Sequence, residues 1–525
     1  MPMDIPARSV GSRVNEPAAA RRRWLILLGA LALAFAFLGT RGLWDPDEGR
    51  YTNVALNMLD SGDWLNPKRN YEVGHWTKPP LTYWALASSF AAFGINTWAA
   101  RLPSALAWLA CVFLVWRTAR RLQPGSEDEA AVVFATMLLP FAASQLVTTD
   151  SLLSCFELLA MWGFVEARFG PPASSRRWLL LTWCGTALAF LTKGPPALLP
   201  LLVMTGFDAL TGLQGRQRLF RWTGLLLFLA LALPWYLAVV IGNPGLLAYF
   251  IGDEVVNRVA TNEFGRNGEW YGWLKVYLPT LLVGTLPWTR DFLVVLGQLP
   301  SRLRRWRRKQ ARATDASHLL PWLWLLLPSL VFCLAKSRLP LYLLPLFAPI
   351  ALLIARHRRE SGKALPHWPW LAGWALLLLG LKLAAAGLPS EKDASAWARE
   401  VAQRNDASTR KIVFVDDSPR YGLHLHLGRG VQVEKIAQLP HPKARFNPDY
   451  DEYIDIEIGE STNDRHAVWI CKLEAWPDVR AALGARGLEA VQLGEPYHDR
   501  VMFRVVSMPS SSAAAMPSRR AATGG

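Results

Sequence analysis

Three carboxylates and an arginine directly follow an uncharged apolar segment near the start of the chain. Residues 44–51 read WDPDEGRY, so Asp47, Glu48 and Arg50 come soon after the apolar run 24–39. A run of this length plus a flanking turn is about enough to span a ~30 Å hydrocarbon core at ~1.5 Å per residue. Asp47 is therefore expected just outside the bilayer, where a carboxylate can deprotonate or orient a reacting group. The alternative is that these acids only cap the helix that follows.

The composition indicates a protein that crosses a membrane many times. Of the 525 residues, 52% are hydrophobic and 19% are charged, and apolar runs recur as far as residue 387. The net charge of +16 comes from arginines that cluster between these runs, not from a nucleic-acid-binding module. Four of the five cysteines lie within apolar runs and no CxxC pattern occurs. We therefore expect neither a disulfide framework nor a zinc motif.

The basic clusters predict a topology, because positive residues favour the cytoplasmic side and an even number of crossings must separate two such clusters. Three apolar runs, 24–40, 80–94 and 98–116, lie between the first two clusters. The middle run is the shortest and follows Lys78, so we expect it to lie on the outer surface. The run 178–209 is interrupted by KGPP and is expected to form two short spans. The parity rule then predicts about eleven crossings plus the surface helix, with the N-terminus cytoplasmic.

This parity places an unusual set of charges on the outer side, at the ends of the spans. A charge inside the bilayer costs about 2.5–3.5 kcal/mol, so such a set favours a functional site, although a single lysine can simply reach into the water. Cations at a lipid-facing cavity suit a reaction whose leaving group is a phosphate on a lipid carrier, and a carboxylate can activate the acceptor. Glycosyl transfer from a polyprenyl-phosphate sugar meets both needs. The set comprises Asp47, Glu48, Arg50, Lys78, Asp150, Lys193, Arg258, Lys336 and Arg338.

The same segments resemble motifs of a known family, the C-type (GT-C) membrane glycosyltransferases, in the group of the aminoarabinose (lipid A) transferases and protein mannosyltransferases. The similarity covers roughly residues 24–360. The segments similar to the family's first outer loop are WDPDEGRY at 44–51, LDSGDW at 59–64, WTKPPL at 76–81 and ARLP at 100–103. Later similar segments are TD at 149–150, LTKGP at 191–195 and RLPLYLLP at 338–345.

The resemblance implies a role for each charged residue of these motifs. Asp47 would be the principal catalytic carboxylate, Asp150 a second acid, and Glu48 the partner that completes the acidic pair. The residues expected to bind the donor phosphate are Arg50, Lys78, Arg258, Lys193 and Arg338, and Tyr342 is expected to line the cavity.

No cofactor follows from the resemblance. Relatives of the lipid A enzyme have an acid before the Lys-Pro pair and a Glu-His pair in a later loop, whereas this chain has Thr77 and Val255 there. A divalent metal is therefore an alternative and not the expectation, and His75 is expected to make a plain polar contact.

The C-terminal region changes to a soluble composition. Residues 388–506 are predicted to form a small extracytoplasmic α/β domain with helices near 392–404 and 474–487 and three or four strands. The predicted strands are Lys411–Val415, Ala467–Cys471 and Val501–Val506. His424 and His426 are two residues apart and are expected to share a strand face in a structural role.

The predicted architecture is thus a polytopic α-helical membrane protein with an extracytoplasmic domain. Its transmembrane glycosyltransferase domain covers 21–387 with a first outer loop at 41–97, and the tails 1–20 and 507–525 are expected to be disordered. The predicted function is transfer of one sugar, with inversion, from an undecaprenyl-type phosphate to a lipid, glycan or protein acceptor at the outer face of a bacterial cytoplasmic membrane. A narrower alternative is 4-amino-4-deoxy-L-arabinose transfer to lipid A. One alternative of another class is a lipid or sugar transporter, in which charges are expected near the bilayer midplane and the two halves of the chain are expected to be repeats. Another alternative is a non-catalytic scaffold.

Overall fold

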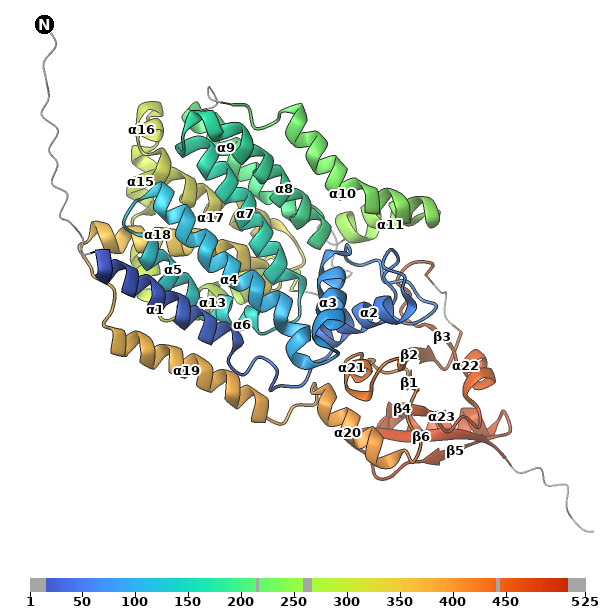
Figure 1. The fold of residues 1–525 in the computed structure, drawn as a ribbon. Helices are drawn as coiled ribbons and strands as arrows, with labels where there is room; N and C mark the ends of the chain where they lie inside the picture. Colours follow the sequence, from blue (N-terminus) through green and yellow to red (C-terminus); the bar gives the residue numbers. More distant parts are fainter. Residues whose placement is uncertain (1–15, 214–216, 258–266, 441–443, 509–525) are drawn as a thin grey trace, which may run out of the picture. The chain divides into compact units, whose positions relative to one another are not determined.

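The computed structural model is mainly helical and describes residues 16–213, 217–257, 267–440 and 444–508 (Figure 1). Arg258 and most of the two predicted tails, residues 1–15 and 509–525, lie outside the described residues. The rest of the tail prediction was wrong at its edges, because residues 16–20 begin a helix and Ser507 ends a strand. The chain divides into two compact units. Unit 1 comprises Met1–Gly42, Val54–Pro67 and His75–Pro389, and unit 2 comprises Leu43–Asn53, Lys68–Gly74 and Ser390–Gly525. The long helix α2, Asp47–Ser61, begins in unit 2 and ends in unit 1.

Unit 1 is built from helices that follow the predicted apolar runs. Five of its helical segments are long and apolar enough to cross a membrane, within the described residues: α4 (Thr97–Leu122), α10 (Trp222–Gly242), α17 (Ala316–Leu334), the continuous segment Pro340–Glu360, and α19 (Trp368–Gly387). The other longer helices are α1 (Glu16–Phe35), α3 (Leu81–Phe93), α7 (Thr149–Phe169), α8 (Ser175–Lys193), α9 (Leu199–Thr211) and α13 (Gly272–Gly284). Shorter ones are α5 (Glu127–Thr136), α6 (Leu138–Ser144), α11 (Leu246–Ile251), the π-helix η4 (Gly252–Asn257), α14 (Thr289–Gly297), α15 (Leu299–Arg305) and α16 (Lys309–Thr314). The segment Pro340–Glu360 consists of η5 (Pro340–Leu346) and α18 (Phe347–Glu360).

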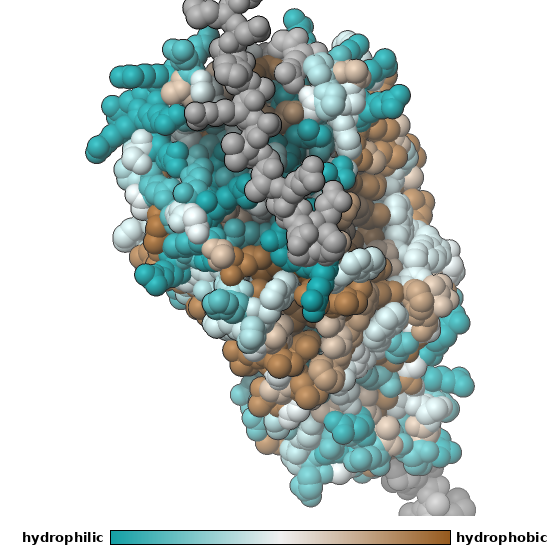
Figure 2. All heavy atoms as spheres, turned by 60° about the vertical axis from the view of Figure 1, so that its left-hand side comes forward, coloured by the Kyte–Doolittle hydropathy of each residue, from teal (hydrophilic) through white to brown (hydrophobic). Residues whose placement is uncertain are grey.

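Apolar side chains remain exposed on the outside of these helices, as lipid contact requires. Leu226 and Ile241 of α10 are 60% and 78% exposed, and Leu376 of α19 is 68% exposed. Figure 2 shows hydrophobic surface next to hydrophilic surface on one face of the molecule. The protein is therefore a multi-pass membrane protein. The 13 residues of α3 rise only ~20 Å, less than a ~30 Å core, which agrees with a surface position, while the number of crossings stays a prediction.

Two long apolar stretches of the sequence are interrupted in the structure. The stretch 130–148 breaks at Met137, whose extended backbone separates α5 from α6. The stretch 273–296 breaks after Gly284, and Pro287 lies in the gap before α14. The interruption at KGPP was predicted correctly: Gly194 has a φ of 75° and is followed by the 3-10 turn η2, Pro195–Leu198.

Helices α7 and α8 form a tightly packed hairpin, and α4 packs against the other side of α7 (Figure 1). Glycines allow the close approach: a Cβ on Gly163 of α7 would lie 2.8 Å from the Trp178 carbonyl oxygen, and one on Gly185 of α8 would lie 2.7 Å from the Ala160 nitrogen. Because the two helices run in opposite directions, the start of α7 lies beside the end of α8. This hairpin therefore brings together two residues that are 43 apart in sequence, Asp150 and Lys193.

At the other end of the hairpin, buried ion pairs hold the charged helix ends. Arg168 of α7 donates two hydrogen bonds to Asp208 of α9, at 2.7 and 2.5 Å. Arg358 of α18 similarly bonds Glu129 and Asp291 at 2.5 and 2.7 Å. The charges of these two clusters thus have partners of opposite sign, which offsets the cost of their desolvation.

The C-terminal part of unit 2 is a six-stranded mixed sheet with helices, where the sequence predicted three or four strands. The strand order is β3-β2-β1-β4-β6-β5, with β3, β2, β1 and β4 parallel and β6 antiparallel to its neighbours. The strands are β1 (Lys411–Val415), β2 (Gln432–Ala437), β3 (Glu452–Tyr453), β4 (Ala467–Lys472), β5 (Leu488–Gln492) and β6 (Arg500–Ser507). The helices are α20 (Ala394–Arg404), α21 (Leu423–Leu427), α22 (Ile454–Ser461) and α23 (Trp476–Gly484).

The strand placement of His424 and His426 was wrong, because both lie in the short helix α21. The sequence LHLHL alternates as a strand does, but Gly422 and a turn at 420–422 start a helix there instead. The buried His424 ring lies beside Asn53 of the same unit.

Candidate active site

The first cluster of predicted residues lies in unit 1 at the open end of the α7–α8 hairpin. Asp150 is in the first turn of α7, and the Thr148 hydroxyl accepts its backbone N–H, which caps the helix. Lys193 is the last residue of α8, and its Nζ lies 2.5 Å from Asp150 Oδ1. Both side chains are only 10% exposed. A cation and a carboxylate held this closely and this far from water form a strong, oriented pair.

An aromatic ring and a second acid surround Lys193. Its Nζ lies 4.5 Å from the ring centroid of Tyr342 in η5, so the tyrosine predicted to line the cavity contacts the predicted phosphate-binding lysine. Glu157, seven residues after Asp150 on α7, is buried and interacts electrostatically with both Lys193 and Asp150. Glu157 was not among the predicted site residues. Its signal was a single acid inside an otherwise apolar run, two helical turns from a predicted site residue.

Lys78 belongs to a second cluster in unit 1. Its Nζ donates to the Thr77 carbonyl oxygen at 2.6 Å and to Glu254 Oε2 at 3.4 Å, and the hydroxyl of Tyr249 donates to the other oxygen of Glu254 at 3.2 Å. Glu254 thus contacts the predicted donor-binding lysine without the histidine that relatives have beside it. The predicted Arg258 follows on the same segment but lies outside the described residues.

His75 makes the plain polar contact that was predicted for it. The ring is buried, and its Nε2 lies 2.8 Å from the Thr77 hydroxyl oxygen.

Arg338 is buried, and its guanidinium is directed to backbone carbonyls. It donates to the oxygens of Asn267 and Glu269 at 2.7 and 2.8 Å and to that of Cys333 at 3.0 Å. In this structure Arg338 therefore secures the segment before α13, and its predicted contact with a donor phosphate stays a prediction.

The second group of predicted residues lies in unit 2, at the start of α2. Asp47 is the first residue of the helix, and its Oδ1 accepts a hydrogen bond from Arg50 at 2.5 Å. The Asp47 side chain is 61% exposed, and the Arg50 guanidinium lies 5.5 Å from the Tyr51 ring centroid. The exposed Asp47 carboxylate is able to contact an acceptor hydroxyl, and the Arg50 guanidinium one turn away is able to contact a phosphate.

The other two acids of WDPDEGRY are buried and bonded to backbone groups. Glu48 is 3% exposed and accepts the Trp44 backbone N–H at 2.8 Å, so the capping alternative describes Glu48 in this structure. Asp45 is 6% exposed and accepts the Gly422 backbone N–H at 3.0 Å. Burial raises the pKa of Asp45 to about 7, against the opposing effect of that hydrogen bond. Asp47 is the acid of this motif that remains accessible.

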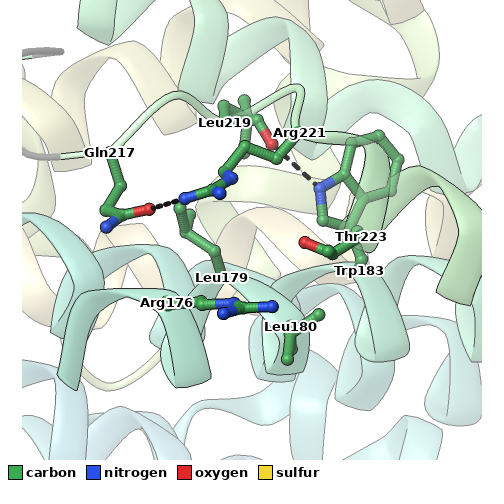
Figure 3. Close-up of a pocket in the computed structure, with 9 residues that line it drawn as sticks. Arg176, Leu179, Leu180, Trp183, Gln217, Leu219, Arg221 and Thr223 are labelled. Atoms are coloured by element: carbon green, nitrogen blue, oxygen red, sulfur yellow. Dashed lines mark hydrogen bonds between the residues drawn. The ribbon is translucent and has the colours of Figure 1, made fainter.

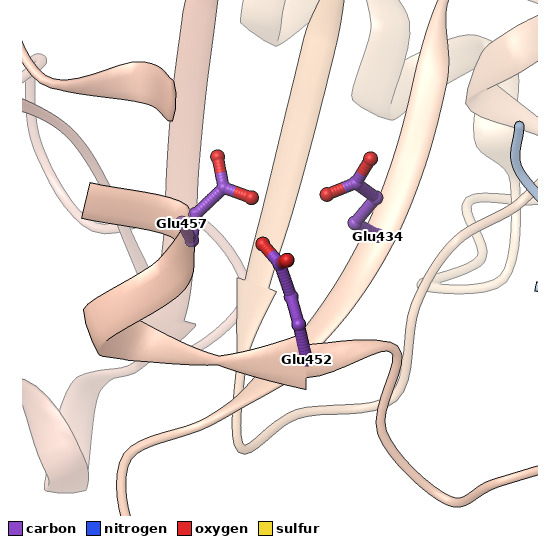
Figure 4. Close-up of side chains that lie close together, drawn as sticks. All are labelled: Glu434, Glu452 and Glu457. Carbon is purple, nitrogen blue, oxygen red and sulfur yellow. The ribbon is translucent and has the colours of Figure 1, made fainter. Parts of the chain in front are cut away.

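Three glutamates in the sheet of unit 2 form a compact acidic cluster, but a lysine already compensates their charge. One carboxylate oxygen of each of Glu434, Glu452 and Glu457 lies within 4.8 Å of the other two (Figure 4). The ammonium of Lys411 lies 3.1 Å from Glu434 and 2.8 Å from Glu457. Burial raises the pKa of Glu434 to about 8 and that of Glu457 to about 7. Partly protonated acids with a lysine between them are a poor ligand set for a dication.

A small surface pocket of about 10 Å³ lies elsewhere in unit 1, at the N-terminal ends of α8 and α10 (Figure 3). It is lined by Arg176, Leu179, Leu180, Trp183, Gln217, Leu219, Arg221, Thr223 and Gly224. It contains none of the predicted site residues. The Trp183 indole N–H donates to the Leu219 carbonyl oxygen and the Arg221 guanidinium to Gln217, which closes the loop over α8 (Figure 3).

The chain is similar to known proteins over most of its length. Residues 77–258 match the family described as dolichyl-phosphate-mannose-protein mannosyltransferase. An undecaprenyl phosphate-alpha-4-amino-4-deoxy-L-arabinose arabinosyl transferase of Pseudomonas aeruginosa (strain UCBPP-PA14) is 34% identical over 381 residues, which cover 70% of this chain and 64% of that relative. Arabinosyl transferase 2 of Pseudomonas fluorescens (strain Pf0-1) is 32% identical over 383 residues, which cover 69% of this chain and 64% of the relative.

Solved structures agree at the level of the fold. ArnT from Cupriavidus metallidurans, determined bound to undecaprenyl phosphate, aligns with a TM-score of 0.73 at 22% identity and covers 92% of this chain and 98% of its own. The apo oligosaccharyltransferase of Archaeoglobus fulgidus gives a TM-score of 0.50 at 11% identity, covering 88% of this chain and 71% of its own.

The protein therefore has the fold of a C-type membrane glycosyltransferase. Its predicted resemblance to the aminoarabinose transferase and protein mannosyltransferase group is confirmed by the family match and by both arabinosyl transferases. The aligned regions span about two thirds of this chain and 64% of the length of those relatives.

Proposed function

We propose that this protein transfers a single sugar from a polyprenyl-phosphate carrier to an acceptor at the extracytoplasmic face of a bacterial inner membrane. The observation that carries the proposal is that a chain related to lipid-phosphate-dependent arabinosyl transferases holds two short carboxylate–cation pairs in the family's motifs. These are Asp47 with Arg50 and Asp150 with Lys193, each at 2.5 Å. Transfer from a lipid phosphate needs both kinds of group.

The reaction is an inverting displacement at the anomeric carbon. The acceptor oxygen attacks that carbon, the bond between carbon and phosphate oxygen breaks, and its electron pair leaves with the polyprenyl phosphate. Asp47 takes the proton of the acceptor, because its carboxylate is the accessible one in the motif. A cation beside the leaving phosphate stabilises the charge that grows on it, and this is the role that Arg50 has in unit 2 and that Lys193 has in unit 1. Asp150 holds Lys193 in place and, with Tyr342, fixes the direction of its ammonium.

The test of this proposal uses the purified full-length protein and a panel of polyprenyl-phosphate donors with different radiolabelled sugars. Cell-envelope lipid, glycan and protein fractions serve as acceptors. The expected result is label in one acceptor fraction and release of an equal amount of free polyprenyl phosphate. If no donor gives labelled product, and the protein in proteoliposomes instead moves the donor across the membrane, the result would support the transporter alternative.

The narrower candidate is transfer of 4-amino-4-deoxy-L-arabinose to lipid A. The names of the two similar arabinosyl transferases favour it, whereas Thr77 and Val255 depart from the pattern of the lipid A enzymes. The donor panel tests this narrower candidate. If it is correct, the arabinose donor is used at least ~10-fold more efficiently than hexose donors, a difference of about 1.4 kcal/mol in transition-state binding.

A further inference from the structure

The segment that carries the acid motif, Leu43–Asn53, is joined to the C-terminal domain inside unit 2. The Asp45 backbone N–H donates to the Lys392 carbonyl oxygen, and the Ala394 N–H donates to the Leu43 carbonyl oxygen, both at 2.9 Å. Trp44 and Asp393 thereby form an antiparallel bridge. Residues 43–45, just before α2, are thus part of the same hydrogen-bonded structure as residues 392–394 at the start of α20.

A pair of glycines lets the first turn of α2 approach the turn before α21. A Cβ on Gly49 would lie 1.9 Å from Asp45 Oδ1 and 2.3 Å from the Gly422 nitrogen. A Cβ on Gly422 would lie 2.6 Å from the Ala394 Cβ. No side chain fits at either position without moving backbone, so the buried Asp45 carboxylate can reach the Gly422 N–H.

The histidines of α21 provide a second attachment. His424 and Asn53 are both buried, and His424 Nδ1 lies 2.8 Å from Asn53 Oδ1. The Leu43 backbone N–H donates to His426 Nε2 at 3.3 Å. These contacts fix both ends of the 43–53 segment.

A third attachment comes from the loop Lys68–Gly74. The Arg69 guanidinium donates to Asp451 Oδ1 at 2.6 Å and to the Pro448 carbonyl oxygen at 2.7 Å, and the side chains of the ion pair are almost fully buried. The Asn53 amide donates in turn to the Arg69 carbonyl oxygen at 2.5 Å. The 43–53 segment is therefore braced by the loop as well as by the domain.

We propose that the C-terminal domain is a positioning element for the transfer reaction, in which Asp45, Gly49, Gly422 and His424 hold the first turn of α2 so that Asp47 is presented correctly. This inference rests on the proposed function. The contacts bury Asp45 and Glu48 at 6% and 3% exposure but leave Asp47 61% exposed, so the domain fixes the motif while its reactive acid stays accessible. A misplacement of ~1 Å can cost ~100-fold in rate, which gives such a fixation a clear kinetic consequence.

The experiment compares Asp45→Ala, Gly422→Ala and His424→Ala with wild type in the full-length protein. Asp45→Asn retains an acceptor oxygen for Gly422 and serves as the conservative variant. Asp455→Ala removes an exposed ion pair with Arg486 in the same domain and is the matched control. The readouts are kcat and KM for the donor, and hydrogen exchange of residues 43–53 relative to strands β1 and β4.

We expect the three disruptive variants to speed exchange in 43–53 without speeding it in the sheet, and to lower kcat ~10- to 100-fold with KM changed less than about twofold. Asp45→Asn is expected to keep most of kcat, and Asp455→Ala all of it.

Wild-type kcat in a variant whose 43–53 segment has loosened would overturn the positioning role while leaving the proposed function intact. Unchanged exchange in 43–53 would overturn it as well. A wild type that transfers no sugar would overturn the proposed function itself. If Gly422→Ala unfolds the sheet, the positioning role is still tested by Asp45→Ala and His424→Ala, because these two substitutions add no atoms.

Discussion

Asp150 and Lys193 are buried together 2.5 Å apart, so removing either charge takes a close partner of opposite sign from the other. Breaking a buried ion pair costs about 3–5 kcal/mol, and the loss of one group that stabilises a transition state costs ~100- to 1000-fold in rate. We predict that Asp150→Asn lowers kcat by at least ~10-fold, measured as sugar transfer from the polyprenyl-phosphate donor.

The matched control is the other buried pair of α7, between Arg168 and Asp208. Asp208→Asn is expected to lower the melting temperature as much as Asp150→Asn does, because it breaks a similar pair on the same helix. It should leave kcat of the folded protein near the wild-type value. Equal losses of kcat in both variants would mean that Asp150 acts only through stability.

Asp45 predicts a pH dependence. Its pKa is raised to about 7 by burial, with Glu48 and Asp393 acting in the same direction and Arg420 opposing them. A carboxyl whose folded pKa is raised contributes stability at low pH and loses it as the pH rises through about 7. Hydrogen exchange of residues 43–53, corrected for its intrinsic rate, should therefore reveal about tenfold more opening at pH 8 than at pH 6. Asp45→Asn should remove this dependence, and a dependence that persists in the variant would assign it to another group.

At the scale of helices, the α7–α8 hairpin determines where Lys193 lies. A Cβ on Gly185 would meet backbone atoms of Ala160 and Phe156 at 2.7 and 2.9 Å, which cannot move aside easily. We predict that Gly185→Val costs about 1–3 kcal/mol of stability and also lowers transfer, because α8 is displaced from α7. Gly380→Ala on α19, where nothing lies within 4 Å, is the control and should change neither the melting temperature nor the rate.

The apolar runs predicted most helices because length and hydrophobicity are local properties of the sequence. The break in 178–209 was predictable from Pro195 and Pro196, and Pro140, in the first turn of α6, is the corresponding signal for the break at Met137. In the sheet, β2 and β5 were missed because they mix polar with apolar residues, and β3 was missed because it has only two residues. Likewise, that Asp45 and Glu48 are buried while Asp47 is exposed depends on contacts with residues near 393 and 422, which no local pattern encodes.

At the scale of the whole molecule, the charge pattern predicts which side of the membrane each segment faces. We expect a cysteine at the exposed Glu72 to react with an impermeant maleimide in cells whose outer membrane alone is permeabilised. A cysteine at the exposed Arg304, in the basic segment of α15, should react only after lysis. Wild type, whose cysteines are buried or half-buried, measures the background. The reverse pattern would invert the topology.

The central claim is that the Asp47 carboxylate takes part in sugar transfer from a polyprenyl-phosphate donor. The most direct measurement is kcat of purified wild type, Asp47→Asn and Asp455→Asn with the best donor of the panel. Asp455 pairs with Arg486 at 2.6 Å and is 64% exposed, so it matches Asp47 in contact and accessibility. We predict a loss of ~100-fold or more for Asp47→Asn and a wild-type rate for Asp455→Asn. A wild-type rate for Asp47→Asn would show that its carboxylate takes no part in the transfer.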